Sequence, residues 1–186
     1  MYSDAYYQTV ERARQYHLKK NVYSGVATIK YHFDIKELVD KHNAKTLLDY
    51  GCGKAFHYFN KERCQTWFGG PTFDKCLGLD SFYLFDPCVD EYSKHPEEGA
   101  KFDSIIAIQS LAGVPDADFP TVINQLMKMT TKFCFIGNKL KKGKASKGDP
   151  ALDQYFKGDR LDPEWIPNGG KNNLKIGRGL SLCLNL

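Results

Sequence analysis

The chain contains 186 residues, a length that favours a single domain. Hydrophobic residues account for 42% and charged residues for 26% of the sequence, which fits an ordinary globular protein. The net charge of +4 permits an anionic partner but does not require one. Apolar runs are shorter than the ~18 residues that span a bilayer, and the first residues do not resemble a signal peptide. We therefore expect a cytoplasmic protein with no membrane contact.

The cysteines and histidines show no spacing typical of a metal site. There is no C-x-x-C pair, and no two histidines are three or four residues apart, so we expect no structural zinc and no bound metal. Reduced and mostly buried thiols are the better interpretation of the cysteines.

The N-terminal part is predicted to be helical. Residues 3–20 begin with Ser3 as a candidate N-cap, and their apolar and aromatic side chains recur on one face, as in an amphipathic helix. A turn at Ser24 and Gly25 follows, and a second helix is predicted at about 33–43. We favour packing, rather than a lid, as the role of the aromatic stripe on the first helix.

Two strands, with a helix and a loop between them, are predicted next. Residues 45–50 form a short strand that runs directly into a glycine-rich turn, and 56–64 are predicted to be helical. The segment 65–80 contains a Gly-Gly-Pro sequence and is predicted to be a loop insertion. Residues 81–85 form a second apolar strand, which ends before an Asp-Pro pair.

The alternation of strands and helices continues to the C-terminus. Residues 102–108 (FDSIIAI) are nearly all apolar, as expected for a strand buried on both faces of a parallel sheet. An amphipathic helix at 116–131 and a buried strand at 132–137 follow. We expect a basic surface loop at 139–150 and a half-buried, alternating strand at 180–186.

Together these elements predict an α/β fold. The sheet is expected to be doubly wound and mostly parallel, with right-handed crossovers and an N-terminal helical extension. We expect a single domain over residues 1–186. Within it, 1–44 would form the helical extension, 45–140 a cofactor-binding core, and 141–186 the basic loop and C-terminal strand.

Glycines and polar side chains follow several of the predicted strands. In a doubly wound sheet the carboxyl ends of neighbouring strands share one edge, where ligands bind. Gly51 and Gly53 allow the backbone to turn sharply and to approach a ligand closely. The carboxylate of Asp86 can accept both hydroxyl hydrogens of a ribose. This pattern predicts a nucleoside-cofactor site; a purely structural turn at the glycines and a turn-capping role for Asp86 are the alternatives.

Two features favour S-adenosylmethionine over NAD as the cofactor. A dinucleotide loop reads G-x-G-x-x-G, and here the bulky Phe56 stands at the position of the third glycine. Asp49, two residues before the first glycine, would repel a nearby pyrophosphate, whereas S-adenosylmethionine carries no phosphate and has an ammonium and a sulfonium group. A solvated strand end is the alternative interpretation of Asp49.

The segment 46–54 (TLLDYGCGK) resembles the first motif of class I S-adenosylmethionine-dependent methyltransferases, which have a Rossmann-like fold. Phe85-Asp86-Pro87, followed by 101–106 (KFDSII), is similar to small methyltransferase-like proteins that bacteriophages often encode. The resemblance covers about 45–140, roughly half of the chain. It implies S-adenosyl-L-methionine as the cofactor, and the host cytoplasm as the location if a phage encodes the chain.

The resemblance also assigns roles to individual residues. Gly51 and Gly53 would line the methionine part of the cofactor, and Asp49 would help to hold its amino group. Asp86 would bind the ribose hydroxyls, and Gln109 would lie near the transferred methyl. The complete set of expected cofactor-binding residues is Asp49, Gly51, Cys52, Gly53, Asp86 and Gln109.

The sequence departs from the family at two places. Ala55 stands where the family often has a third glycine, which is a small change. At 109–115 (QSLAGVP), relatives commonly carry an acidic residue and a Glu-His pair. No catalytic residue is assigned: His57 and His95 are candidate general bases, but we expect both to be surface histidines.

The expected reaction is transfer of the sulfonium methyl to an unidentified nucleophilic acceptor. Such transfer needs little beyond orientation and exclusion of water, because the leaving group is already activated. The alternative is a protein that binds the cofactor without methyl transfer: a sensor, a cofactor-consuming phage factor or a degenerate scaffold.

A third class, a basic nucleic-acid-binding module, has no recognition motif in its favour. Nucleic acid stays a candidate partner through the lysines of the basic loop, although such runs are usually only solvated. These lysines are Lys139, Lys141, Lys142, Lys144 and Lys147.

Overall fold

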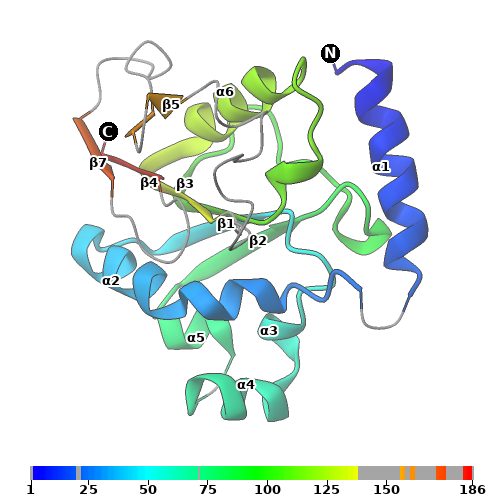
Figure 1. The fold of residues 1–186 in the computed structure, drawn as a ribbon. Helices are drawn as coiled ribbons and strands as arrows, with labels where there is room; N and C mark the ends of the chain where they lie inside the picture. The colour runs from blue at the N-terminus through cyan, green and yellow to red at the C-terminus, as the bar shows by residue number, and fades with distance from the viewer. Residues whose placement is uncertain are drawn as a thin grey trace.

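The computed structural model describes residues 2–19, 22–70 and 72–137, together with the backbone of four short strands near the C-terminus. Its centre is a four-stranded parallel sheet with the order β2-β1-β3-β4 (Figure 1). The strands are β1 (Thr46–Tyr50), β2 (Ser81–Phe85), β3 (Phe102–Ile108) and β4 (Thr130–Gly137). The four predicted core strands and the parallel α/β sheet are thus confirmed.

Helices cover both faces of this sheet, as a doubly wound fold requires. On one face, α6 (Phe119–Met129) packs its buried stripe, which includes Val122 and Leu126, against alternate residues of β1 and β3. On the other face, α2 (His32–His42) buries Ile35 and Leu38 against the remaining alternate residues. The central strands β1 and β3 are buried from both sides over most of their length, which accounts for their nearly continuous apolar residues.

The connection between β1 and β2 is helical over most of its length. It contains α3 (Phe56–Phe59), α4 (Lys61–Phe68) and α5 (Phe73–Leu77), all on the face covered by α2. The predicted helical segment 56–64 is confirmed apart from a break at Asn60, whereas the predicted loop at 65–80 was wrong, because α4 continues to Phe68 and α5 covers Phe73–Leu77. The side-chain oxygen of Asn60 accepts the Arg63 N–H and begins α4 as a cap. Burial of Phe73 and Leu77 stabilises a short helix that propensity alone does not favour.

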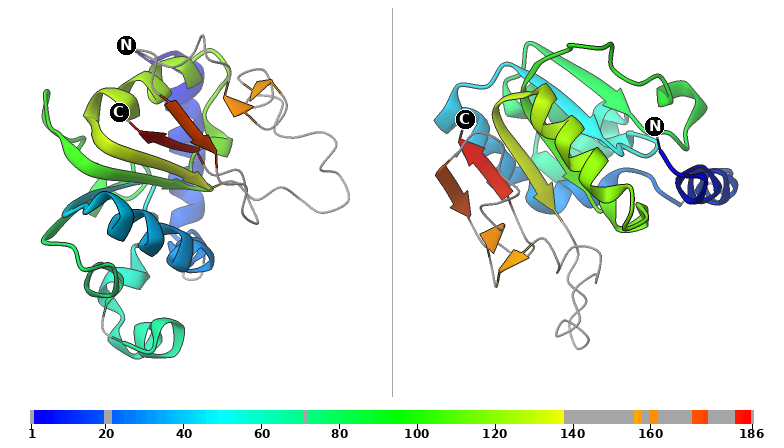
Figure 2. Two further views of the ribbon diagram at one scale, coloured as in Figure 1. Left: turned by 90° about the vertical axis from the view of Figure 1, so that its left-hand side faces the viewer. Right: turned by 90° about the horizontal axis from the view of Figure 1, so that it is seen from above.

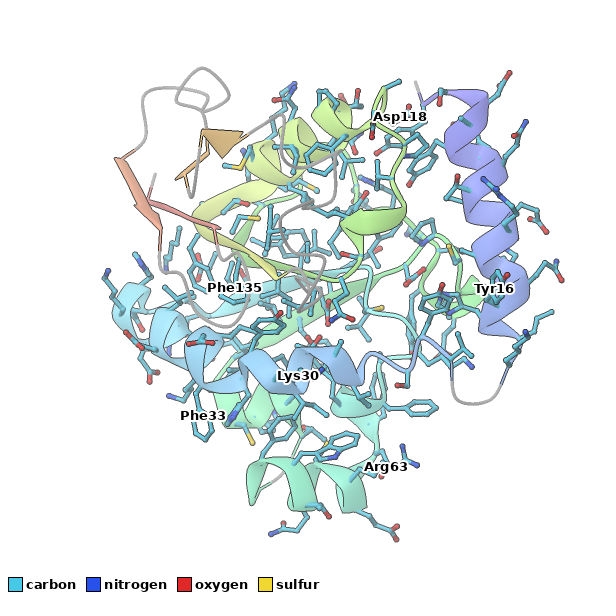
Figure 3. All side chains as sticks on the ribbon, in the orientation of Figure 1. Tyr16, Lys30, Phe33, Arg63, Asp118 and Phe135 are labelled. Carbon is cyan, nitrogen blue, oxygen red and sulfur yellow. The ribbon has the colours of Figure 1, made fainter. Side chains whose placement is uncertain are left out.

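The N-terminal helix α1 (Asp4–His17) crosses the carboxyl ends of the strands, and it is fixed near both ends. Ser3 caps it as predicted and also donates its N–H and hydroxyl to the carboxylate of Asp118. Figure 3 shows Asp118 near the start of α1. Farther along, Arg14 donates to the carbonyl of Pro87 and lies 3.5 Å from a carboxylate oxygen of Asp90. A six-residue 3-10 helix, η1 (Val26–Tyr31), connects this region to α2.

Short antiparallel strands lie at the other side of the molecule from α1 (Figure 2). β7 (Lys171–Leu174) pairs with β8 (Leu182–Asn185), and β8 lies beside β4. β5 (Phe156–Lys157) pairs with β6 (Arg160–Leu161). The predicted C-terminal strand is confirmed for its backbone, and the predicted basic loop at 139–150 lies outside the described residues. None of the helices described has the length and apolar character that a membrane span needs.

A carboxylate at the amino end of the sheet offers a test of the fold. Asp103 accepts the Lys45 N–H at 2.7 Å and lies 3.1 Å from the ammonium of Lys132. Burial by itself raises the pKa of Asp103, but the hydrogen bond from Lys45 and the nearby Lys132 hold it below its ordinary value. We expect Asp103→Asn to lower the free energy of unfolding by about 1 kcal/mol at neutral pH, measured by urea denaturation.

The sign of the pH dependence follows from that lowered pKa. The folded state binds fewer protons at Asp103 than the unfolded state. The stabilisation by the Asp103 carboxylate is therefore complete above the unfolded pKa and is lost as the pH falls through the folded pKa. The difference between wild type and Asp103→Asn should therefore shrink in the acidic range. Asp40→Asn, at an exposed i,i+4 pair with Lys36, is the control and should cost less. If the difference in the free energy of unfolding between wild type and Asp103→Asn stays the same in acid, the ionised Asp103 carboxylate is not the source of the stabilisation.

Candidate functional site

A cavity of about 540 Å³ lies at the carboxyl ends of β1, β2 and β3, beneath α1. The chain leaves β1 toward β2 on one side and later returns to β3 on the other, so the strand order reverses between β1 and β3. Crevices at such a reversal are the usual ligand sites of open α/β sheets. The lining residues that follow the three strands are Gly51, Gly53, Asp86, Pro87, Cys88, Gln109 and Ser110.

The glycine turn after β1 is held tightly by the protein itself. Gly51 has a φ of +82°, and a Cβ there would lie 2.0 Å from the Cβ of Ser110. Gly53 has a φ of +59°, and a Cβ there would lie 2.3 Å from the carbonyl oxygen of Tyr23. Packing against neighbouring segments therefore requires both glycines, in addition to any ligand that approaches them.

Asp86 and the glycine turn meet in space, as the nucleoside-site hypothesis requires. The carboxylate is 7% exposed; its Oδ2 accepts the Gly53 N–H at 2.9 Å and its Oδ1 accepts the Cys88 N–H at 2.8 Å. Each carboxylate oxygen keeps acceptor capacity for a further hydrogen bond. Burial, together with the charge of Asp86, raises the pKa of the Cys88 thiol to about 12. The carboxylate thus lies beside a neutral thiol.

Asp49 and Cys52 lie behind the cavity wall and not on it. Asp49 is 1% exposed, and its Oδ2 lies 3.2 Å from the Nε2 of His57, which has no exposed surface. Cys52 is packed into the core on the α2 face of the sheet. The prediction that His57 lies on the surface was therefore wrong. The alternative interpretation of Asp49 as a solvated strand end was wrong as well. The cause is α3, which begins directly beneath the glycine turn and places the His57 ring against Phe73.

Gln109 lies where the sequence placed it, at the end of β3 and on the cavity wall. Its φ is +56°, an uncommon value for a residue other than glycine, and its N–H donates to the carbonyl of Gly137 at 2.7 Å. The neighbouring Ser110 hydroxyl is buried and has no hydrogen-bond partner in the described part of the chain. His95, by contrast, lies on the surface as expected.

One face of α1 forms a wall of the cavity. The contributing residues recur every three or four positions: Tyr6, Thr9, Val10, Ala13 and His17. The predicted stripe of α1 therefore has two roles: the buried Tyr6 packs against the core, and the stripe also lines the cavity. Tyr16, which the sequence placed on the same stripe, is 52% exposed and does not line the cavity (Figure 3).

Sequence reasoning did not single out His17, Cys88 or the segment 23–28, all of which line the cavity. A signal existed for His17, because it lies four residues after Ala13 and so continues the same helical face. For 23–28 the sequence offered only the turn residues Ser24 and Gly25. A Cβ on Gly25 would lie 2.5 Å from the carbonyl oxygen of Cys52, so this segment is pressed against the glycine turn.

The electrostatic character of the wall is unusual for a site at a glycine turn. Among the described lining residues, Asp86 is the sole Asp or Glu, and none is a lysine or arginine. Burial lowers the pKa of His17, although the charge of Asp86 opposes this, and burial raises the pKa values of Tyr6 and Tyr50. The wall therefore presents one carboxylate among neutral polar groups, which suits a neutral or cationic ligand better than a phosphate.

His17, Asp86 and Cys88 offer side-chain atoms that lie within 4.8 Å of one another, a set that could contact a metal ion. They come from α1 and from the turn after β2, so sequence spacing could not have brought them together. The expectation of no bound metal stays a prediction.

No family model and no curated protein matches the sequence. Among solved structures, the chain is similar to magnesium protoporphyrin IX methyltransferase from Synechocystis PCC 6803, crystallised with bound SAH, at 13% identity and a TM-score of 0.42. That match covers 86% of this chain and 82% of the other. A proposed S-adenosyl-L-methionine-dependent methyltransferase from Methanococcus maripaludis is similar at 9% identity and a TM-score of 0.46, covering 100% of this chain and 94% of the other. At these identities and TM-scores the likenesses carry no functional argument.

Proposed function

We propose that the chain binds S-adenosyl-L-methionine in the cavity beneath α1 and transfers its sulfonium methyl to an acceptor. The observation that carries this proposal is the convergence of the glycine turn and the Asp86 carboxylate on one cavity, joined by the hydrogen bond from Gly53. The cavity lies where the strand order reverses and has a size typical of small-molecule sites.

The hydrogen bonds of the glycine turn argue against a dinucleotide. Phosphate-binding loops direct free backbone N–H groups at the ligand. Here the N–H groups of Gly51 and Cys52 both donate to the carbonyl of Phe85, and that of Gly53 donates to Asp86. The next residues are also engaged, since Lys54 donates to Tyr23 and Phe56 to Ser24. A pyrophosphate would find no free N–H among these groups and would face a carboxylate.

The same features suit a nucleoside with a sulfonium side chain. A carboxylate beside the glycine turn can accept the ribose hydroxyls, and a wall whose described residues include no lysine or arginine tolerates positive charge. The protein need only orient the reactants and exclude water, because the sulfonium is an activated leaving group. The α1 wall would contribute to that exclusion.

Calorimetry with S-adenosyl-L-methionine, its demethylated product SAH, and NAD tests the binding part. We expect the first two to bind and NAD not to bind. Asp86→Ala should weaken binding of SAH by about 1–3 kcal/mol, because a charged acceptor is lost. Asp80→Asn, at an exposed carboxylate just before β2, is the matched control and should bind like wild type. Equal affinity in Asp86→Ala would remove the ribose assignment.

A radiolabelled methyl-transfer screen tests the reaction. Purified protein and labelled S-adenosyl-L-methionine would be incubated with nucleic acid, protein and small-molecule fractions of a cell extract. Label in one fraction would support methyl transfer and identify the acceptor class. Binding of the cofactor without label in any fraction would contradict the transfer step and leave a protein that only binds the cofactor.

A further inference from the structure

A second polar group faces the same end of the cavity as Asp86. His17 lies in the last turn of α1, lines the cavity, and is grouped with Asp86 and Cys88 within 4.8 Å. Its Nδ1 atom is buried and has no hydrogen-bond partner among the described residues. Buried nitrogen atoms are nearly always hydrogen-bonded, and leaving one without a partner is unfavourable. The Nδ1 atom is therefore available for a ligand.

The imidazole ring is also held in place. It stacks on the ring of Tyr23, with 4.6 Å between centroids and 20° between planes, and Tyr23 itself lines the cavity. The backbone of Tyr23 is fixed by its carbonyl, which accepts the Lys54 N–H at 2.8 Å beside the glycine turn. A hydrogen-bonding atom on a ring fixed in this way loses little conformational freedom when it binds.

We propose that His17 is a specificity-determining residue, which together with Asp86 recognises the vicinal hydroxyl pair of the ligand's ribose. This assignment rests on the proposed function. One hydroxyl would donate to the Asp86 carboxylate, and its neighbour would exchange a hydrogen bond with the Nδ1 of His17. A 2′,3′-diol has two such groups on adjacent carbons, and a ring nitrogen of His17 lies within 4.8 Å of a carboxylate oxygen of Asp86.

The protonation states of the surrounding groups are compatible with this role. Burial lowers the pKa of His17, so the ring is neutral at neutral pH, and its Nδ1 accepts or donates according to the tautomer. The Cys88 thiol beside it stays protonated. Both oxygens of Asp86 already accept backbone N–H groups, which orients the carboxylate before any ligand arrives.

A metal ion is the competing occupant of these three side chains. It would have to displace the Cys88 thiol proton, which burial and the neighbouring carboxylate retain in the absence of metal, and it would replace the ribose at Asp86. We therefore favour the hydroxyl pair as the occupant. Ligand binding is measured with EDTA-treated protein and with protein to which zinc has been added, so that a bound metal would be detected.

The experiment compares SAH, adenosine, 2′-deoxyadenosine and 3′-deoxyadenosine on wild type, His17→Phe and His17→Asn. His17→Phe keeps a flat ring against Tyr23 but removes the nitrogen, and His17→Asn offers a polar atom near the Nδ1 position. We expect His17→Phe to weaken SAH binding about fivefold to tenfold, the effect of one lost hydrogen bond. His17→Asn should recover part of that loss. Tyr16→Phe, on the exposed neighbouring position of α1, should bind like wild type.

The deoxynucleosides separate a specific contact from a general disturbance of α1. In wild type, both deoxy compounds should bind several-fold more weakly than adenosine, because each lacks one of the two hydroxyl contacts. His17→Phe should remove the preference for adenosine over one deoxy compound and keep the preference over the other, which reports on Asp86. If His17→Phe keeps both wild-type preferences while SAH still binds, the His17 assignment is wrong and the proposed function stands. If wild type binds none of the adenosyl compounds, the proposed function fails and the assignment fails with it. If the preferences depend on added zinc, the metal occupies the site and the assignment is overturned.

Discussion

Gly51→Ala is expected to abolish SAH binding and to lower the free energy of unfolding by about 2–5 kcal/mol. An alanine at a φ of +82° costs about 1–2 kcal/mol by itself. Its Cβ would also lie 2.0 Å from the Cβ of Ser110, which forces the end of β3 away from the glycine turn. Overpacking of this kind costs about 1–3 kcal/mol more. Urea denaturation and calorimetry measure the two effects.

Two further variants separate the backbone cost from the steric one. Gly69→Ala places an alanine at a φ of +65° with no atom within 4 Å of the new Cβ, so it should show the backbone cost alone. Gly51→Ala combined with Ser110→Gly removes the closest contact and should recover part of the lost stability. A Gly51→Ala protein as stable as Gly69→Ala would contradict the close approach of β3 to the turn.

His57→Leu is expected to destabilise the protein by about 3–5 kcal/mol, because it leaves the Asp49 carboxylate buried without its partner. Both side chains are almost completely buried, and the Nε2 to Oδ2 distance is 3.2 Å. The pair lies directly beneath the glycine turn, so cofactor affinity should fall together with stability. Thermal and urea unfolding at neutral pH measure the loss.

The control for this prediction removes the charge as well. Asp49→Asn combined with His57→Leu leaves no buried carboxylate and should recover a substantial part of the stability lost in His57→Leu. Asp80→Asn, at an exposed carboxylate, should be close to wild type in the same assay. If the double variant is as unstable as the sum of the two single variants, Asp49 and His57 do not act as a pair.

The strands that position the site, and most of the residues that follow them, could be predicted from the sequence. The strands at 102–108 and 132–137 were recognisable because burial on both faces demands continuous apolar residues. Gly51, Gly53, Asp86 and the end of β3 were expected at one edge of the sheet because parallel strands bring their carboxyl ends together. The structure places all of them there, around one cavity.

The incorrect predictions share a physical cause. The segment 65–80 was predicted as a loop from its glycines and proline, yet Phe73 and Leu77 bury their side chains against α2 and form a helix. His57 was predicted on the surface because a single histidine carries no periodic signal. Its burial depends on where α3 lies relative to Asp49, a contact that local sequence does not encode.

The sequence by itself determined the parallel α/β sheet, the glycine turn and the carboxylate that follows β2, because periodicity and chain order carry that information. Only the tertiary structure decided that α1 forms a wall of the site, that Asp49 pairs with His57 beneath the glycine turn, and that His17 lies beside Asp86. These three outcomes arise from packing between segments far apart in the chain, where shape and burial, rather than local pattern, select one arrangement.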